Sequence, residues 1–404
     1  MCEEKDNILE IIDCEVAEIE DELIRDRRHL HMHPEVSYDT AETDKYVRAR
    51  LERLGIEMPS AKMGVFGLIP GRDHGKMILL RADMDALPIQ EENEVPYCST
   101  VPGKMHACGH DAHTSMLLAA AAILKKHAEL LPYDVLLMFQ PAEEGPAPGG
   151  CKFMVEDIAE KGWLDKIVAG YAQHVFNDSS TGTISYKYGS LAASTDEFYI
   201  NITGKGGHAG LPHECIDALS VGAKVVGAIE TFISRRIDPF DQVVCSIGRF
   251  HAGNAINVVA ETCEIAGTIR CQRNPLREVI IENITRIVEG ICTGYGAQCE
   301  IRINRGLTVL ENNDRVIDYI RKIAPDVVGE SGVLITPHAM MGAEDFCFAT
   351  AAMPAAMTWL GSWKEGLSRT NHHPKFNIDE ACMKYGVKMF CNFALRCEEL
   401  EAPR

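Results

Sequence analysis

The stretch MILLRADMD, residues 77–85, joins a short apolar run to two carboxylates. Two later runs have the same form: VLLMF at 135–139 is followed by two glutamates, and IVAGYA at 167–172 is followed by a histidine. Short apolar runs that alternate with helical stretches predict the buried strands of an α/β sheet. Because ligands of open α/β sheets bind at the carboxyl ends of the strands, we expect the polar residues after these runs to share one site.

Two helices are predicted ahead of this sheet. The apolar residues from Ile8 to Leu23 recur at helical spacing, and a charged amphipathic stretch runs from Ala41 to Leu54, just before Gly55. Both patterns are typical of helices with one buried face, so two helices should open the fold.

The pattern changes near Tyr186, where a second domain is expected. The elements that follow read strand, helix, strand, strand, helix, strand, which is typical of a sheet covered by one layer of helices. We predict that residues 187–306 form this inserted α+β sandwich. The α/β pattern then resumes, so the catalytic α/β domain should be discontinuous, with residues 1–186 and 307–404. At 404 residues the chain exceeds the roughly 250–300 at which one core stops growing, which also favours two domains.

The charge balance and the cysteines restrict the class of protein. Forty basic against fifty-nine acidic residues give a net charge of −19, which disfavours unspecific binding to nucleic acid or to anionic membranes. The N-terminal segment is acidic and shows no signal-peptide pattern, and the most apolar run, 116–124, is shorter than the ~20 residues of a membrane span. The fifteen cysteines are odd in number and contain no CxxC pair, which favours reduced thiols. We predict a cytoplasmic protein.

The segment MHACGHDAHTSM, residues 105–116, holds the densest group of metal-binding side chains. Cys108 and His110 lie two residues apart, directly before an alanine- and leucine-rich stretch that predicts a helix. A buried thiol beside a capping histidine is the alternative interpretation. Asp111 falls at the start of the predicted helix, where a carboxylate interacts favourably with the helix dipole. This position is compatible with both interpretations.

The segment FQPAEEG, residues 139–145, places two adjacent carboxylates after a strand. Glu143 and Glu144 would repel each other in a low-dielectric site unless a cation or a proton compensated their charge. A solvated surface pair is the alternative. His174 in AQHV and His372 in TNHHPKF are further candidates, although a lone histidine is commonly structural.

Together these side chains provide the thiolate, imidazole and carboxylate ligands of two divalent transition-metal ions. Zinc, manganese and cobalt all remain open. Such ions supply a nucleophile for amide hydrolysis at neutral pH, and a carboxylate that is not a ligand can carry the proton from the water to the leaving amine.

The motifs resemble those of the dinuclear metal amidohydrolases, the family of hippurate hydrolase, plant auxin-conjugate hydrolases, bacterial aminoacylases and acetyl-diaminopimelate deacetylase. The resemblance covers nearly the whole chain, and its segments follow the family's order: HPEVSYDTAET, RADMDALPI, MHACGHDAHT, FQPAEEG, GKGGHAGLPH, INVV…GTIR, GAEDF and HHPKF. By matching position it implies Glu143 as general base and five metal ligands: Cys108, His110, Glu144, His174 and His372. His373 falls where the family tolerates other residues.

The sequence departs from the wider clan at the end of the first strand. Asp83 stands where that clan has a ligand histidine, and the resemblance implies that Cys108 and His110 are recruited instead. Asp85 would then orient an imidazole. The clan also places a bridging aspartate near Asp111, a role that this branch lacks.

Three further histidines and two further acids receive supporting roles. We interpret the alternating His29, His31 and His33 as structural, because they precede Pro34 at the end of a predicted helix. Glu344 and Asp345 in GAEDF are expected behind the metal ligands rather than among them.

In the insert, the resemblance implies that the glycine-rich turn GKGGHAGLPH delivers His208 toward the substrate carbonyl. A histidine that caps the following helix is the alternative. Asn257 and Arg270 match substrate-contacting positions, and Arg270 would pair with a substrate carboxylate, or with an acid of its own sheet. Ala260 departs from a proline of many relatives. The resemblance to dimeric relatives implies that the protein is a homodimer joined through this insert. The insert would also serve as a lid.

The sequence therefore predicts metal-dependent hydrolysis of N-acyl-amino acids to a carboxylic acid and a free amino acid. A carboxypeptidase or dipeptidase is the alternative within the same class, because the bond that is cut is the same. An inactive relative that only binds metal or a small ligand is the alternative from another class. Glu143 opposes it, since a binding protein needs no spare carboxylate beside the ions.

Overall fold

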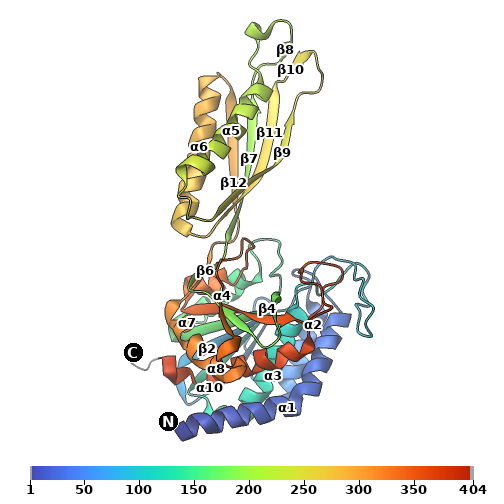
Figure 1. Ribbon diagram of the computed structural model, residues 1–404, viewed down its shortest axis with the longest axis vertical. Helices are drawn as coiled ribbons and strands as arrows, with labels where there is room; N and C mark the ends of the chain where they lie inside the picture. Colours follow the sequence, from blue (N-terminus) through green and yellow to red (C-terminus); the bar gives the residue numbers. More distant parts are fainter. Residues whose placement is uncertain (1, 401–404) are drawn as a thin grey trace. The chain divides into compact units, whose positions relative to one another are not determined.

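The computed structural model describes residues 2–400, with side chains from residue 7 onward, and it divides into two compact units (Figure 1). Unit 1 comprises residues 1–189, 311–338 and 345–404, and unit 2 comprises residues 190–310 and 339–344. The predicted insert, 187–306, begins and ends a few residues earlier than unit 2 and lacks its segment 339–344. Two short strands span the unit boundaries in sequence, β6 (Gly189–Ala192) and β13 (Leu310–Asn312).

Unit 1 is built on a seven-stranded sheet in the order β1-β3-β2-β4-β15-β5-β14. Its strands are β1 (Val65–Ile69), β2 (Asp73–Asp83), β3 (Tyr133–Gln140), β4 (Ile167–Ser180), β5 (Ile184–Tyr186), β14 (Val333–Ile335) and β15 (Ala355–Trp363). The pairs β2/β3, β2/β4, β4/β15 and β5/β14 are parallel, whereas β1/β3 and β5/β15 are antiparallel. The three predicted runs lie in β2, β3 and β4, so the mostly parallel α/β sheet is confirmed.

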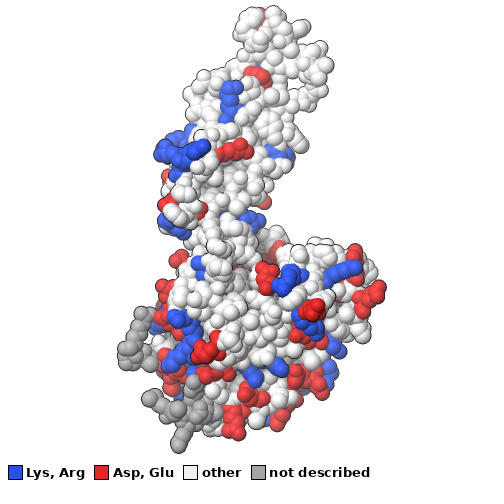
Figure 2. All heavy atoms as spheres, viewed as in Figure 1, with Lys and Arg blue, Asp and Glu red and all other residues white. Residues whose placement is uncertain are grey.

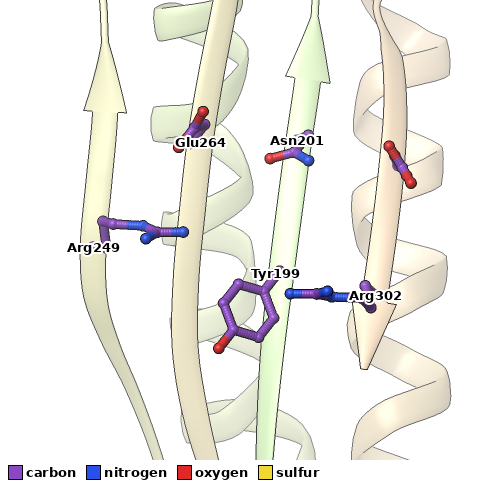
Figure 3. A pocket seen from close by; sticks show the side chains of 6 residues that line it. Tyr199, Asn201, Arg249, Glu264 and Arg302 are labelled. Carbon is purple, nitrogen blue, oxygen red and sulfur yellow. The ribbon is translucent and has the colours of Figure 1, made fainter. Parts of the chain in front are cut away.

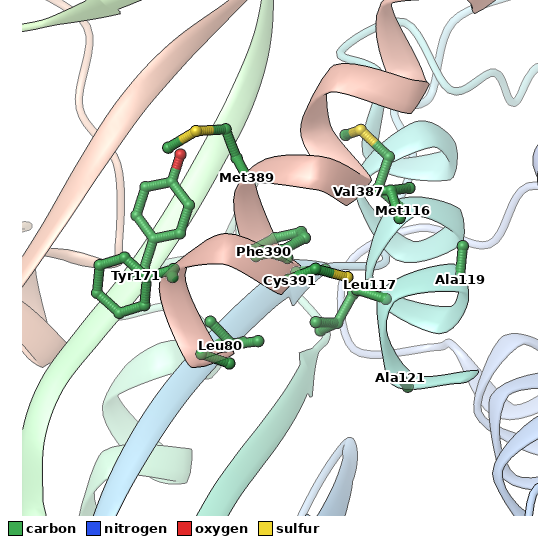
Figure 4. Close-up of a cluster of buried hydrophobic side chains, with 14 of the residues drawn as sticks. Leu80, Met116, Leu117, Ala119, Ala121, Tyr171, Val387, Met389, Phe390 and Cys391 are labelled. Carbon is green, nitrogen blue, oxygen red and sulfur yellow. The ribbon is translucent and has the colours of Figure 1, made fainter. Parts of the chain in front are cut away.

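Helices cover this sheet and bury its apolar side chains. They are α1 (Cys2–Met32), α2 (Ala41–Arg53), α3 (His110–Lys126), α4 (Gly150–Glu160), α7 (Asp314–Ile323), α8 (Pro325–Val328), α9 (Cys347–Ala352) and α10 (Met383–Leu395). The helix α3 packs on β2 and β4, and α1 and α10 lie beside it. Figure 4 shows the core where α3 and α10 meet the sheet, with Met116, Tyr171 and Phe390 among its buried side chains. The two predicted N-terminal helices are confirmed as α1 and α2.

The register of the parallel strands brings their polar ends together. Asp83, the last residue of β2, pairs with Gln140, the last residue of β3. On the other side of β2, Arg81 pairs with Ala172 of β4, so His174 lies two residues further along β4 at the same edge of the sheet. The carboxyl ends of β2 and β3 therefore lie beside His174.

Unit 2 is a four-stranded antiparallel sheet in the order β12-β7-β11-β9. Its elements are β7 (Ser194–Thr203), β8 (Gly207–His208), α5 (Ala218–Arg236), β9 (Val243–Ala252), β10 (Val258–Val259), β11 (Thr262–Cys271), α6 (Asn274–Gly294) and β12 (Gln298–Arg305). Apart from the short pair β8/β10, this is the predicted order, and α5 and α6 pack on one face over a separate core. A buried fork from Arg277 to Asp196, with distances of 2.6 and 2.7 Å, ties α6 to β7.

The other face of this sheet is polar and forms a shallow pocket of about 310 Å³ (Figure 3). Arg302 on β12 and Arg249 on β9 extend from the two outer strands toward Tyr199, with guanidinium carbons 4.5 and 6.0 Å from the ring centre. Glu264 and Asn201 lie in the neighbouring row. One face of the sheet is thus a core face and the other faces solvent.

Charged side chains are spread over the visible surface of unit 1, where acidic and basic residues lie intermixed (Figure 2). None of the helices in the described part of the chain is long and apolar enough to cross a lipid bilayer.

Candidate active site

The turn before α3 carries Cys108 and His110. Gly109 adopts φ +87°, a left-handed conformation, and a Cβ atom there would lie 2.3 Å from a methyl carbon of Val175. Only glycine fits this close approach, which fixes the turn against β4. Cys108 is 8% exposed and His110 is fully buried, so both side chains lie inside unit 1.

The loop after β3 presents Glu143 and Glu144. Ala142 adopts φ +58°, a strained conformation for alanine that the surrounding contacts maintain. The two carboxylate oxygens of Asp85 accept the backbone N–H groups of Glu143 and Glu144, at 2.8 and 3.1 Å. Asp85 therefore fixes the backbone orientation of both glutamates.

Asp345 holds the two ends of the same loop. Its Oδ1 accepts from Gln140 at 2.8 Å and from Arg81 at 3.0 Å, and its Oδ2 accepts the N–H of Cys151 at 2.9 Å. A Cβ atom on Gly149 would lie 2.3 Å from this oxygen. Asp345 is thus a support of the loop, behind Glu143 and Glu144.

Two histidines from other segments complete the group. His174 on β4 donates from Nδ1 to the carbonyl oxygen of Val175 at 2.6 Å, so its Nε2 keeps a lone pair and lies 3.3 Å from Sγ of Cys108. His372, with φ +58°, donates its backbone N–H to Ala107. Its Nε2 lies 3.4 Å from Sγ of Cys108 and 3.0 Å from Oε1 of Glu144.

These side chains form two groups with one member in common. Within each group the ligand atoms lie within 4.8 Å of one another. The first group is Cys108, His110 and His174, and the second is Cys108, Glu144 and His372. The five side chains predicted as ligands thus come together in two triads that share the Cys108 thiol. Glu143 lies beside them, with Oε2 3.8 Å from Nε2 of His110, and it forms a further possible ligand group with His110 and Glu144.

Burial opposes the charged forms of Cys108 and His174. Burial, and then the Glu144 carboxylate, raise the pKa of the Cys108 thiol. Burial lowers the pKa of His174 well below its usual value. Hydrogen bonds to Cys108 and Glu144 raise the pKa of His372 to about 10. A divalent cation would reverse the penalty on the thiolate, because it stabilises the deprotonated form.

The free ligand atoms of His110 also fit a metal ion. Both of its ring nitrogens are buried without a hydrogen bond to the described residues. Nδ1 lies 3.6 Å from Asp85, and Nε2 lies 3.8 Å from both Asp83 and Glu143. Buried polar atoms without partners are uncommon in folded proteins. The ring nitrogens of His110 are therefore suited to bind a metal ion.

Asp83 and His113 form a nearby pair whose polar atoms are already in use. Asp83 accepts from Nη1 of Arg81 at 2.7 Å and from Nδ1 of His113 at 2.5 Å. The other ring nitrogen of His113, Nε2, accepts the N–H of Val175 at 2.8 Å. These contacts leave no lone pair of His113 for a metal. Asp83, His110 and His113 also lie close enough together to form a possible metal-binding group.

Asp111 and His31 are both fully buried and contact each other. Asp111 directs Oδ2 toward α1, where it accepts from Nδ1 of His31 at 2.7 Å. His31 also contacts Glu91 through Nε2 at 3.1 Å, so both of its nitrogens are in use. His29 stacks on Tyr46, which leaves it in a structural position.

In unit 2, His208 is exposed on the short strand β8. Its Nδ1 accepts the N–H of Gly210 at 2.9 Å, so the neutral ring carries its proton on Nε2. His208 pairs with Val258 of β10, which brings the neighbouring residue Asn257 to the same end of the sheet. Arg270 on β11 donates to the carbonyl oxygen of Met341 at 3.3 Å. Ala260 is buried, and its carbonyl accepts the N–H of Ala218.

Sequence reasoning missed the residues that orient the group, namely Arg81, His113 and Gln140. His113 lies three residues after His110, on the same face of α3, and that spacing was a usable signal. Arg81 gave no signal, because a lone arginine inside an apolar run reads as a strand residue that reaches solvent. Here it is 1% exposed.

A family model described as peptidase family M20/M25/M40 matches residues 79–396. The chain is 37% identical to an N-acetylcysteine deacetylase of Bacillus subtilis over 92% of this chain and 96% of the relative. It is 35% identical to thermostable carboxypeptidase 2 of Saccharolobus solfataricus over 96% of this chain and 99% of the relative. A crystal structure of a dinuclear metal-binding peptidase of the M20 family from Bacillus subtilis superposes with a TM-score of 0.80 at 33% identity. That match covers 95% of this chain and 99% of the other.

Proposed function

We propose, from the finding that this chain belongs to peptidase family M20/M25/M40, that it hydrolyses the amide bond of N-acyl-amino acids to a carboxylic acid and a free amino acid. The deacetylase relative at 37% identity supports this substrate class. The observation that carries the proposal is the pair of triads that share Cys108, with the carboxylate of Glu143 beside them and outside both.

The two triads would hold two divalent metal ions. The dinuclear relative at 33% identity supports that number. Bound there, the ions would supply Lewis acidity and an activated water. A thiolate with imidazole and carboxylate ligands suits zinc, manganese or cobalt, and the choice among them is left to metal analysis.

Glu143 is the proposed general base and acid. Asp85 fixes its backbone. The Glu143 carboxylate lies near His110 and Glu144 but belongs to neither of the two triads that share Cys108. From that place it takes a proton from the attacking water and returns it to the nitrogen of the leaving amino acid.

His208 is the proposed donor to the carbonyl oxygen. The contact from Gly210 to Nδ1 leaves Nε2–H as the outward donor, which is the tautomer that this role needs. We further propose that Asn257 and Arg270 contact the substrate, with the Arg270 guanidinium pairing with its carboxylate. We also propose a homodimer through the insert and a cytoplasmic location. In such a dimer His208 would serve either its own chain or the site of the partner.

A carboxypeptidase is the second candidate, because the thermostable carboxypeptidase is 35% identical along nearly its whole length. A substrate panel separates the two. Acetyl-, benzoyl- and indoleacetyl-amino acids should release amine faster than dipeptides do. Faster cleavage of the dipeptides would favour the peptidase, and no release from any compound would favour a binding protein.

Replacement of the shared thiol tests the metal centre. We expect Cys108→Ser to lower metal occupancy and activity together, because an alcohol oxygen is a poor substitute for a thiolate toward zinc or cobalt. The measurement is metal content by mass spectrometry after dialysis, beside the rate of amine release. Strong chelators and thiol oxidants should inactivate the wild type.

Cys14→Ser is the matched control, since Cys14 is an exposed thiol of α1. It should keep full occupancy and the same sensitivity to oxidants. If Cys108→Ser kept both ions and full activity, the thiol would not belong to the site.

A further inference from the structure

One arginine of α1 contacts the two segments that carry the proposed metal ligands. Arg27 is 1% exposed and donates from Nε to Oδ2 of Asp111 at 2.9 Å. It also donates from Nη2 to Oδ1 of Asn377 at 3.0 Å and from Nη1 to Glu380 at 3.1 Å. Asp111 follows His110 directly, and Asn377 lies in the segment that begins with His372.

The contact with Asp111 is reinforced from the same helix. His31 lies one turn after Arg27 and shares its face, and its Nδ1 contacts the same oxygen of Asp111 at 2.7 Å. Asp111 is therefore clamped between two side chains of α1 through a single carboxylate oxygen.

The C-terminal contact is also part of a wider set. Oδ1 of Asn377 accepts the N–H of Ile378 at 2.9 Å, and its backbone carbonyl accepts from Asn177 at 2.9 Å. His372 donates its backbone N–H to Ala107, at the start of the turn that carries Cys108. The two ligand-bearing segments thus touch each other at one end and share Arg27 at the other.

We propose that Arg27 is a positioning residue that sets the spacing between the Cys108/His110 turn and the His372 segment, and so the fit of the shared metal site. A guanidinium suits this task because its planar fork reaches several acceptors in fixed directions, which the single ammonium of lysine does not. Arg27 lies outside residues 79–396, the part matched by the family model. The inference rests on the proposed metal centre.

The test is Arg27→Lys, which keeps the charge and removes the fork. We expect its affinity for Co²⁺ or Zn²⁺, measured by competition with a chromophoric chelator, to fall roughly 10- to 100-fold, as is typical when supports of metal ligands are lost. The sulfur-to-cobalt absorption band of the Co²⁺ protein should shift or weaken. Asp111→Asn, which weakens the same clamp, should act in the same direction.

Arg28→Lys is the matched control, because Arg28 is the next residue, is exposed, and pairs with the same Glu380 at 2.6 Å. It should change metal affinity by less than about twofold, as expected of an exposed ion pair. A purely structural role would lower the melting temperature of metal-free Arg27→Lys while leaving its metal affinity and cobalt spectrum at wild-type values. That result would overturn the proposal.

Three further outcomes have a fixed interpretation. If Arg27→Lys is not recovered folded, Asn377→Ser replaces it, and unchanged metal affinity there would count against the shared positioning. If the wild type itself binds no metal, the proposed function fails. If the wild type binds two ions and Arg27→Lys binds them equally well, only this inference fails.

Discussion

Glu143→Gln is expected to lower kcat by at least about 10²-fold while both metal ions stay bound, because general acid–base catalysis supplies about 10²–10⁴. The amide keeps the size and the hydrogen-bonding backbone of the glutamate, whose N–H is held by Asp85 at 2.8 Å. It cannot accept a proton from water at neutral pH. The measurement is the steady-state rate together with metal content of the same sample.

Glu144→Gln is the informative neighbour, because its side chain contacts His372 and belongs to a triad with Cys108. It should lose metal, and activity only as a consequence. If instead Glu143→Gln lost an ion and Glu144→Gln kept both, the two roles would be exchanged. Comparison of the two variants therefore separates a proton carrier from a ligand at adjacent positions of one loop.

The sheet of unit 1 was predictable where the pattern is local. The runs in β2, β3 and β4 are apolar along their whole length, as buried parallel strands are. The positions of these strands could therefore be predicted directly from the sequence. The short strands β5 and β14 have three residues each and gave no such signal. Their pairing depends on partners that are far away in the sequence. The same holds for residues 339–344, which join unit 2 from beyond its predicted end.

The candidate site was predictable as a set of residue types and less so as a network. Cys108, Glu144 and His372 could be selected from motifs, and the structure brings them together although their roles stay predictions. The supports were hidden because each joins residues distant in sequence. Arg27 and Asp111 are 84 residues apart, and Arg81 and Asp345 are 264 apart. No periodicity reports such pairs, since burial of an arginine depends on acceptors that only the folded chain supplies.

His208→Ala is expected to lower kcat by roughly 10²–10³-fold, the usual effect of removing one donor to a developing oxyanion, with little change in metal content. The physical reason is the tautomer that Gly210 fixes, which leaves Nε2–H free to donate. His213→Ala is the matched control, because His213 is an exposed histidine that follows in the same loop. It should retain wild-type rates.

Mixing experiments decide whether His208 serves its own chain or the partner. Glu143→Gln and His208→Ala, each nearly inactive, are co-refolded and the heterodimer is purified through two different tags. If His208 acts across the interface, one site of each heterodimer combines an intact Glu143 with an intact His208. The heterodimer should then recover up to about half of the wild-type rate, because one of its two sites is complete. If His208 acts within its own chain, every site lacks one of the two groups, and the rate stays at the level of the single variants. A preparation that remains monomeric but is fully active as the wild type would exclude action in trans directly.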